Sequence, residues 1–279
     1  MDDDARPEQG PAGEVRRDRY VGGRDLTHWT TRVGRAVARL VEQLGRRLGP
    51  HAALLLTLAI GLAVAAGLAA GGAEVYEAVT DEDGLANLDM PITAWFAEWR
   101  PGWFGPAVTA YTDVAGVIGM PVLAIAVMLL LAIRRRSWTP VILMLSAGLG
   151  SLLMTIVAKG FIGRSRPPLE LAVPPYEHSA SFPSGHTLNA TVIAGIVAYL
   201  IVLRLERRWQ RVVTIAIAAV FAITIGLSRV VLGHHWLTDV VAAWALGAAW
   251  LVLVITAHRL YLTVRRASVE PDGEAVPAP

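Results

Sequence analysis

Six uncharged, apolar stretches run through this chain of 279 residues, and they limit its fold more than any other feature. Each is about 16 to 24 residues long, near the length at which a helix crosses the roughly 30 Å hydrocarbon core of a bilayer. Only 17% of the residues are charged, whereas a soluble domain carries about 25%. The sequence therefore predicts an all-α integral membrane protein with six transmembrane helices, in a domain covering residues 49–262. The stretches span residues 50–73, 114–133, 137–158, 187–203, 212–227 and 240–257.

The two ends of the chain are polar and charged, which predicts disordered cytoplasmic tails over residues 1–25 and 263–279. Residues 26–48 place apolar side chains three and four positions apart, with most arginines off that stripe. This pattern predicts a basic amphipathic helix at the inner membrane surface, where arginines can meet lipid phosphates. A helix packed against another part of the protein is the alternative. The stripe consists of Trp29, Val33, Val37, Leu40, Val41, Leu44 and Leu48.

Arginine clusters orient the predicted helices. Residues 134–136, 204–211 and 265–266 fall, with the N-terminal arginines, on one side of a six-helix count. That side is cytoplasmic by the positive-inside rule. Both termini then lie in the cytoplasm, and the chain is expected to be a multi-pass protein of the plasma membrane. The opposite, extracytoplasmic side holds only Arg100, Lys159, Arg164, Arg166 and Arg229.

An outer segment, residues 81–113, separates the first two apolar stretches. It carries Trp95, Trp99 and Trp103, which are spaced four apart and would form one stripe on a helix. Tryptophan is enriched at the membrane–water interface. The segment is therefore predicted to lie in the outer interface.

The chain contains no cysteine, which excludes disulfides, thiolate metal sites and a cysteine nucleophile. Its unusual polar residues gather in three segments at the outer ends of the last four helices. The segments are KGFIGRSRPP at 159–168, SFPSGHT at 181–187 and SRVVLGHHWLTD at 228–239. If these helices bundle, the three segments meet at one mouth. That mouth would contain three cations, Lys159, Arg166 and Arg229, and guanidinium groups suit the oxygens of a phosphate.

The second segment predicts a phosphate cradle. Ser184 and Gly185 stand just before a predicted helix start. Glycine lets the backbone approach an anion closely, and the free N–H groups at a helix N-terminus favour negative charge. His186 would lie at the rim of this cradle.

The third segment predicts a nucleophile. His235 and Asp239 are four apart, so at the start of a helix they share one face. The carboxylate can accept the Nδ1–H of the ring and leave Nε2 free to attack. His186 could then protonate the leaving oxygen. No metal is required, because the three cations can neutralise the charge that develops on the phosphoryl oxygens.

The three motifs together resemble the type-2 phosphatidic acid phosphatase superfamily, which also includes the vanadium-dependent haloperoxidases. They match in order and spacing, and the resemblance covers about residues 89–257. The motifs are Lys-x6-Arg-Pro at Lys159, Arg166 and Pro167, Pro-Ser-Gly-His at 183–186, and Ser-Arg-x5-His-x3-Asp at Ser228, Arg229, His235 and Asp239.

The resemblance implies a six-helix core with a metal-independent lipid phosphatase site that needs no cofactor. It implies that His235 forms a phosphohistidine, that Asp239 orients it, and that His186 acts first as acid and then as base. The implied substrates are phosphatidic acid, phosphatidylglycerol phosphate or a polyprenyl pyrophosphate such as undecaprenyl pyrophosphate. The phosphate would be bound by Lys159, Arg166, Ser184, Gly185 and Arg229.

Other functions stay open at this point. A phosphotransferase would use the same phosphohistidine with another acceptor. A transporter would line a path with intramembrane charges, but here the charges gather at one mouth. A haloperoxidase would hold vanadate in the cradle, which six membrane spans disfavour. The expected partners are a lipid substrate and the bilayer, with no nucleic acid, and a homo-oligomer is left open.

Several polar residues near the motifs receive weaker interpretations. Arg164 could touch either the substrate or a lipid headgroup. His234 is expected to be structural or interfacial, and Trp236 an interfacial anchor. His178, Glu170 and Glu177 are expected to be solvated loop residues.

Overall fold

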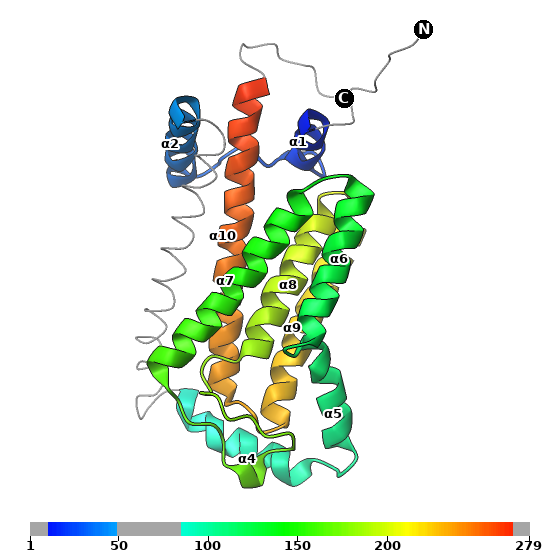
Figure 1. Ribbon diagram of the computed structural model, residues 1–279, viewed down its shortest axis with the longest axis vertical. Helices are drawn as coiled ribbons and strands as arrows, with labels where there is room; N and C mark the ends of the chain where they lie inside the picture. The colour runs from blue at the N-terminus through cyan, green and yellow to red at the C-terminus, as the bar shows by residue number, and fades with distance from the viewer. Residues whose placement is uncertain (1–10, 49–84, 270–279) are drawn as a thin grey trace.

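The computed structural model describes residues 11–48 and 85–269 (Figure 1). The predicted first span, residues 50–73, and the start of the outer segment lie outside these ranges. Within them, four helices are long and apolar enough to cross a membrane, or five if a pair bent by 44° counts as one span. The pair joins residues 104–115 to α6 (Gly119–Arg135). The four helices are α7 (Thr139–Ile162), α8 (Gly185–Val202), α9 (Arg208–Val231) and α10 (Leu237–Val269).

The all-α membrane fold is thus confirmed, with helix ends set by local chemistry. Ser137 accepts a hydrogen bond at Oγ from the N–H of Thr139 where α7 begins, and Pro140 sits in its first turn. Gly163, in the left-handed conformation at φ +57°, ends α7. Glycine favours this conformation because it has no Cβ.

The core is built around α8, which packs against α7, α9 and α10. One face of α8 buries Leu188, Val192, Ile196 and Leu200, each one turn apart. Because lipid tails are as apolar as these side chains, close packing has to hold the helices together. The α10 side of this cluster is formed by Ala243, Trp250 and Val254, and the α7 side by Leu143, Met144, Ala147 and Met154.

Contact between α7 and α10 is close at Trp250. Its indole Nε1 donates to the Ala147 carbonyl at 3.0 Å. A Cβ added at Gly150 would lie 2.1 Å from the Trp250 ring. Only glycine at position 150 leaves room for the indole against α7. The faces of α6 and α9 that point away from the bundle expose large apolar side chains, as contact with lipid requires. Among these side chains are Ile125 and Ile133 on α6 and Ile217 and Val220 on α9.

The outer segment folds as short helices at the end of the bundle where α8 and α10 begin (Figure 1). It contains η1 (Leu85–Leu88), α4 (Asp89–Trp99), α5 (Phe104–Thr112) and η2 (Asp113–Ala115). The three tryptophans are exposed, as the interfacial prediction requires. They do not share one helix, because α4 ends at Trp99, followed by an extended Arg100 and by Pro101. Proline has no N–H and its predecessor disfavours helix.

The N-terminal residues differ from the predicted tail. Residues 11–25 form α1 (Pro11–Arg19) and a short antiparallel hairpin with two residues in each strand. The strands are β1 (Tyr20–Val21) and β2 (Arg24–Asp25). Asp18 is buried and ion-paired with Arg204 at 3.0 Å. The prediction of disorder is therefore wrong for residues 11–25. At the other end, α10 continues through residue 269, into the predicted C-terminal tail.

The predicted amphipathic helix corresponds to α2 (Arg32–Leu48). Its Ala38 and Val41 pack against Leu260 and Val264 of α10. Val33 and Leu40 remain exposed. The helix thus docks on the long α10 with one side and leaves an apolar strip uncovered on another.

Candidate active site

The three motif segments converge at the end of the bundle where α8 and α10 begin, as the sequence predicts. Backbone hydrogen bonds join them. The Ser184 N–H donates to the Asp239 carbonyl at 3.3 Å, and the Ser181 N–H donates to the Arg164 carbonyl at 2.8 Å. Residues more than 50 positions apart along the chain therefore share one small region.

The start of α8 has the form of an anion cradle. Ser184 is extended and fully buried, and α8 begins at Gly185. The Thr187 hydroxyl donates to Ser184 Oγ at 2.8 Å. A Cβ at Gly185 would lie 3.3 Å from the methyl of Thr155, so a larger residue would crowd α7. The first N–H groups of a helix have no intrahelical acceptor and can bind an anion.

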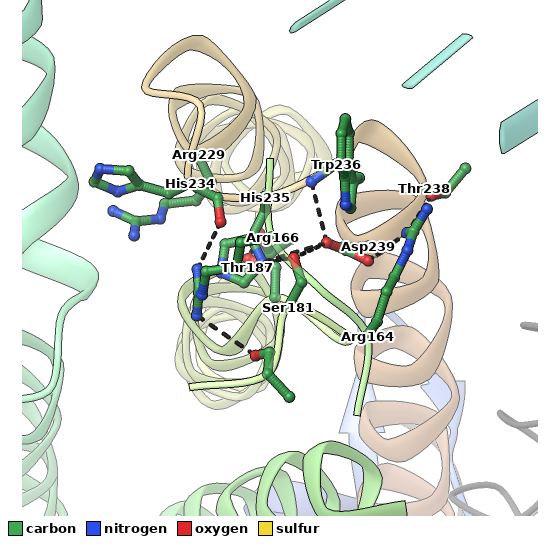
Figure 2. Close-up of polar contacts among 12 residues, drawn as sticks. Arg164, Arg166, Ser181, Thr187, Arg229, His234, His235, Trp236, Thr238 and Asp239 are labelled. Atoms are coloured by element: carbon green, nitrogen blue, oxygen red, sulfur yellow. Dashed lines mark hydrogen bonds and ion pairs between the residues drawn. The ribbon is translucent and has the colours of Figure 1, made fainter. Parts of the chain in front are cut away.

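His235 and Asp239 lie side by side in the third segment (Figure 2). His235 Nδ1 is 3.5 Å from Asp239 Oδ2, longer than an ordinary hydrogen bond but close enough for a charged pair. Asp239 Oδ2 also accepts from the Trp236 N–H at 3.0 Å and from the Ser181 hydroxyl. His235 is buried, and this burial lowers its pKa to about 4 against the opposing effect of Asp239. The ring is thus neutral at pH 7, as a nucleophile must be.

The three predicted cations all face this region. Arg166 lies closest to the ring, with one terminal nitrogen 3.3 Å from His235 Nε2 and bound to the His234 carbonyl at 2.6 Å. Lys159 donates to the Ala180 carbonyl. Arg229 is 2% exposed, and its Nε–H has no acceptor among the described residues. A buried, unsatisfied donor beside two further cations fits a phosphate oxygen.

Known proteins are similar to this chain in sequence and fold. The model of the PAP2 superfamily matches residues 139–261, from the start of α7 into α10. Phosphatidylglycerophosphatase B of Bacillus subtilis (strain 168) is 32% identical over 182 residues, which are 64% of this chain and 88% of that protein. This chain belongs to the PAP2 superfamily. It is a membrane phosphatase of that family.

A solved structure supports the same fold for this PAP2 phosphatase. The crystal structure of a transmembrane PAP2 type phosphatidylglycerolphosphate phosphatase from Bacillus subtilis superposes with a TM-score of 0.59 at 28% identity. The match covers 74% of this chain and 93% of the other. The mostly helical membrane architecture is therefore common to both.

Glu177 is the first site residue that sequence reasoning missed. It was expected to be a solvated loop charge, but its carboxylate is ion-paired with Arg229 and lies 2.7 Å from Arg166. Burial alone would raise its pKa, yet the positive charges of Arg229 and Arg166 hold the pKa at about 2. One available signal was the charge count, because three cations next to a bilayer require a counter-charge.

Arg164 and Asp89 form the second group that was missed. Arg164 was left open between substrate and lipid headgroup. It instead donates to Asp239 Oδ1 at 2.6 Å and to Asp89 Oδ2 at 2.8 Å. Asp89 carried no predicted role, since a single carboxylate in an outer segment has no recognisable pattern.

The neighbouring His234 and Trp236 have structural contacts. The His234 ring is buried, and its Nε2–H donates a hydrogen bond to the Val173 carbonyl at 2.7 Å. This agrees with the structural interpretation. The Trp236 indole donates to the Ser165 carbonyl at 2.9 Å, so it fixes the first motif segment.

Proposed function

We propose that this PAP2 phosphatase hydrolyses a lipid phosphate or pyrophosphate through a phosphohistidine on His235. One observation carries the proposal. The Glu177 carboxylate, an anion, lies 3.9 Å from His235 Nε2 while it contacts both Arg166 and Arg229. An oxyanion therefore fits beside the nucleophilic nitrogen with two guanidinium groups around it. A substrate phosphoryl group placed there would lie beside the attacking nitrogen.

The first step transfers the phosphoryl group to the protein. Neutral His235 attacks phosphorus with the Nε2 lone pair, the N–P bond forms, and the bond from phosphorus to the leaving oxygen breaks. His186 donates a proton to that oxygen, which leaves as the lipid alcohol or, from a pyrophosphate, as the lipid monophosphate. Asp239 stabilises the positive charge that develops on the His235 ring. The equatorial oxygens are bound by Lys159, Arg166, Arg229, Ser184 and the N–H of Gly185.

The second step releases phosphate. His186, now neutral, takes a proton from a water molecule, which attacks phosphorus. The N–P bond breaks, His235 recovers its lone pair, and orthophosphate leaves. Charge on the phosphoryl oxygens is neutralised by protein cations throughout, so neither step requires a metal ion.

Phosphatidylglycerol phosphate is the first substrate to test, because both the similar sequence and the similar solved structure carry that activity in their names. Phosphatidic acid and undecaprenyl pyrophosphate are the other members of the proposed class. The membrane helices allow the lipid tail to stay in the bilayer while its headgroup reaches the site.

The proposed topology has six spans, with both termini in the cytoplasm and the active site outside the plasma membrane. Support comes from arginine: the ends of α6 and α8 that lie away from the site carry Arg134, Arg135 and Arg204. Residues 26–48 then lie at the inner surface, with α2 presenting arginines to lipid phosphates beside its exposed Val33 and Leu40.

Phosphate release from purified, full-length protein in detergent with excess chelator tests the function. Phosphatidylglycerol phosphate, phosphatidic acid and undecaprenyl pyrophosphate are compared side by side. We expect turnover without metal, competitive inhibition by orthovanadate, and a loss of at least about 10³-fold in His235→Ala. His186→Ala and Arg229→Ala should also lose activity. Strict dependence on magnesium, or robust turnover by His235→Ala, would contradict the proposal. Transfer of phosphate to added glycerol, in place of release, would identify a phosphotransferase.

A further inference from the structure

We propose that Arg164 and Asp89 are a positioning pair, which holds the Asp239 carboxylate in the orientation and charge state that His235 needs. The inference rests on the proposed function of His235. Figure 2 shows Arg164 and His235 on opposite sides of Asp239. Neither member of the pair belongs to the predicted phosphate cradle. Their effect on the reaction would pass through Asp239.

The contacts of Arg164 are short and directed. One terminal nitrogen donates to Asp239 Oδ1 at 2.6 Å and to Thr238 Oγ1 at 2.7 Å. The other donates to Asp89 Oδ2 at 2.8 Å. Its side chain is 10% exposed, and those of Asp89 and Asp239 are 5% and 0% exposed. Charge pairs with this geometry and burial are costly to break from one side.

Asp89 anchors the same structure from α4. Its Oδ1 accepts from the Thr238 N–H at 3.0 Å, and its Oδ2 accepts from the Thr238 hydroxyl at 2.6 Å. Thr238 is the second residue of α10, so Asp89 satisfies a donor in the first turn of the helix that carries Asp239. Because Asp89 begins α4, this contact fastens the outer segment to the catalytic end of α10.

The two oxygens of Asp239 have separate tasks. Oδ1 is held by Arg164, while Oδ2 faces Ser181, the Trp236 N–H and His235 Nδ1. With Oδ1 fixed, the carboxylate cannot rotate away from the ring. Without Arg164, the Oδ2–Nδ1 contact, already 3.5 Å long, has one restraint fewer.

The charges of Arg164, Asp89 and Asp239 also act together on His235. Arg164 faces two carboxylates, so the three side chains together carry one negative charge. Asp89 offsets Arg164 and leaves the field of Asp239 available to the imidazolium that forms during attack. Removing Arg164 should therefore raise the pKa of His235, and removing the charge of Asp89 should lower it. If Arg164 and Asp89 only stabilised the fold, the two substitutions would not shift the pKa of His235 in opposite directions.

All variants keep the other charged groups around His235. A difference in the pKa of His235 between variants therefore measures the effect of Arg164 or Asp89. The charged and titratable groups facing His235 are Asp239 on α10, Arg229 on α9, His186 on α8, and Arg166 and Glu177 in the loops.

The experiment compares Arg164→Gln, Arg164→Lys and Asp89→Asn in the full-length protein, with kcat and KM measured from pH 3 to 8 on one lipid phosphate. We expect Arg164→Gln to lose about 10- to 100-fold in kcat, the range seen when an outer partner of a metal ligand is removed. KM should change by less than about threefold, because Arg164 does not bind the phosphate. The acid limb of kcat/KM should move to higher pH in Arg164→Gln and to lower pH in Asp89→Asn. Arg164→Lys should recover part of kcat.

Arg100→Gln is the matched control. Arg100 is another outer arginine, but it donates to the carbonyls of Val231 and Leu171. Its loss should lower thermal stability and leave the acid limb in place. A raised KM with unchanged kcat in Arg164→Gln would make Arg164 a substrate ligand and overturn the inference. Lowered stability with wild-type pH profiles in both variants would also overturn it. Failure of the function itself would show separately, as retained activity in His235→Ala.

Discussion

Glu177 is ion-paired with Arg229 at the end of the bundle where the three motif segments meet. Its second carboxylate oxygen reaches Arg166. Two of the three cations proposed to bind phosphate are thus occupied by a carboxylate of the protein itself. A substrate phosphate has to displace this carboxylate or share the arginines with it.

Glu177→Gln should therefore tighten the binding of phosphate analogues. The amide keeps the shape of the side chain but gives up its charge-assisted bonds, each worth about 1.5–3 kcal/mol. Since 1.4 kcal/mol corresponds to a factor of ten, we expect the Ki of orthovanadate to fall by about tenfold or more. Inhibition kinetics in detergent give this value directly. Glu170→Gln, an exposed glutamate in η3 (Leu169–Leu171), is the control. A higher Ki in Glu177→Gln would mean that Glu177 assists binding.

The convergence of the three motif segments could be predicted because each segment has a local signature. His186 follows Pro-Ser-Gly at a helix start, and His235 and Asp239 have the spacing of one helical turn. Glu177, Arg164 and Asp89 have no such signature. Their roles depend on partners that the fold brings near, and a lone carboxylate in a loop resembles any solvated charge.

The N-terminal residues illustrate the same limit. Residues 11–25 have the composition of a disordered tail, yet Asp18 pairs with Arg204 and approaches Arg135 at 3.8 Å. Both arginines lie more than 100 positions away in the chain. Periodicity and composition report only on neighbours along the sequence, so a segment ordered by distant partners is missed.

Gly233 should tolerate no side chain. It has φ +68°, and an added Cβ would lie 2.5 Å from the Leu171 carbonyl oxygen. Gly163 is the matched control, with φ +57° and nothing within 4 Å of an added Cβ. Gly163→Ala should cost about 1–2 kcal/mol from the left-handed backbone alone. Gly233→Ala should cost more and also reduce kcat, because the clash displaces His235 two residues away. Thermal unfolding and turnover of both variants test this, and equal losses would refute it.

Stability should decline as the pH falls below about 6.5, with His235 as one cause. In the unfolded chain a histidine gains a proton near pH 6.5, whereas the pKa of folded His235 is about 4. The unfolded state therefore binds more protons in this window, and each pH unit of acidification costs up to about 1.4 kcal/mol. Measurements from pH 7.5 to 5 avoid Glu177, whose folded pKa of about 2 affects stability only below its usual value of 4.5.

Denaturant unfolding of wild type and His235→Gln over that range makes the comparison, because glutamine does not titrate. The stability of the variant should fall less steeply with acidification. His28→Gln, which removes an exposed histidine, serves as the control. Parallel curves for wild type and His235→Gln would show that the ring is not held neutral by burial.

The proposed topology can be tested with single cysteines, because the natural chain has none. Gly102, in the exposed turn between α4 and α5, lies at the end of the bundle that carries the motif segments. Exposed Glu206 lies in the turn between α8 and α9 at the opposite end. A membrane-impermeant maleimide applied to intact cells should label Gly102→Cys. It should label Glu206→Cys only after permeabilisation, since the arginines near that turn keep it in the cytoplasm. The cysteine-free parent chain gives the background, and permeabilised cells confirm that both thiols react. The reverse labelling pattern would place the active site in the cytoplasm and exclude recycling of lipid phosphates on the outer leaflet.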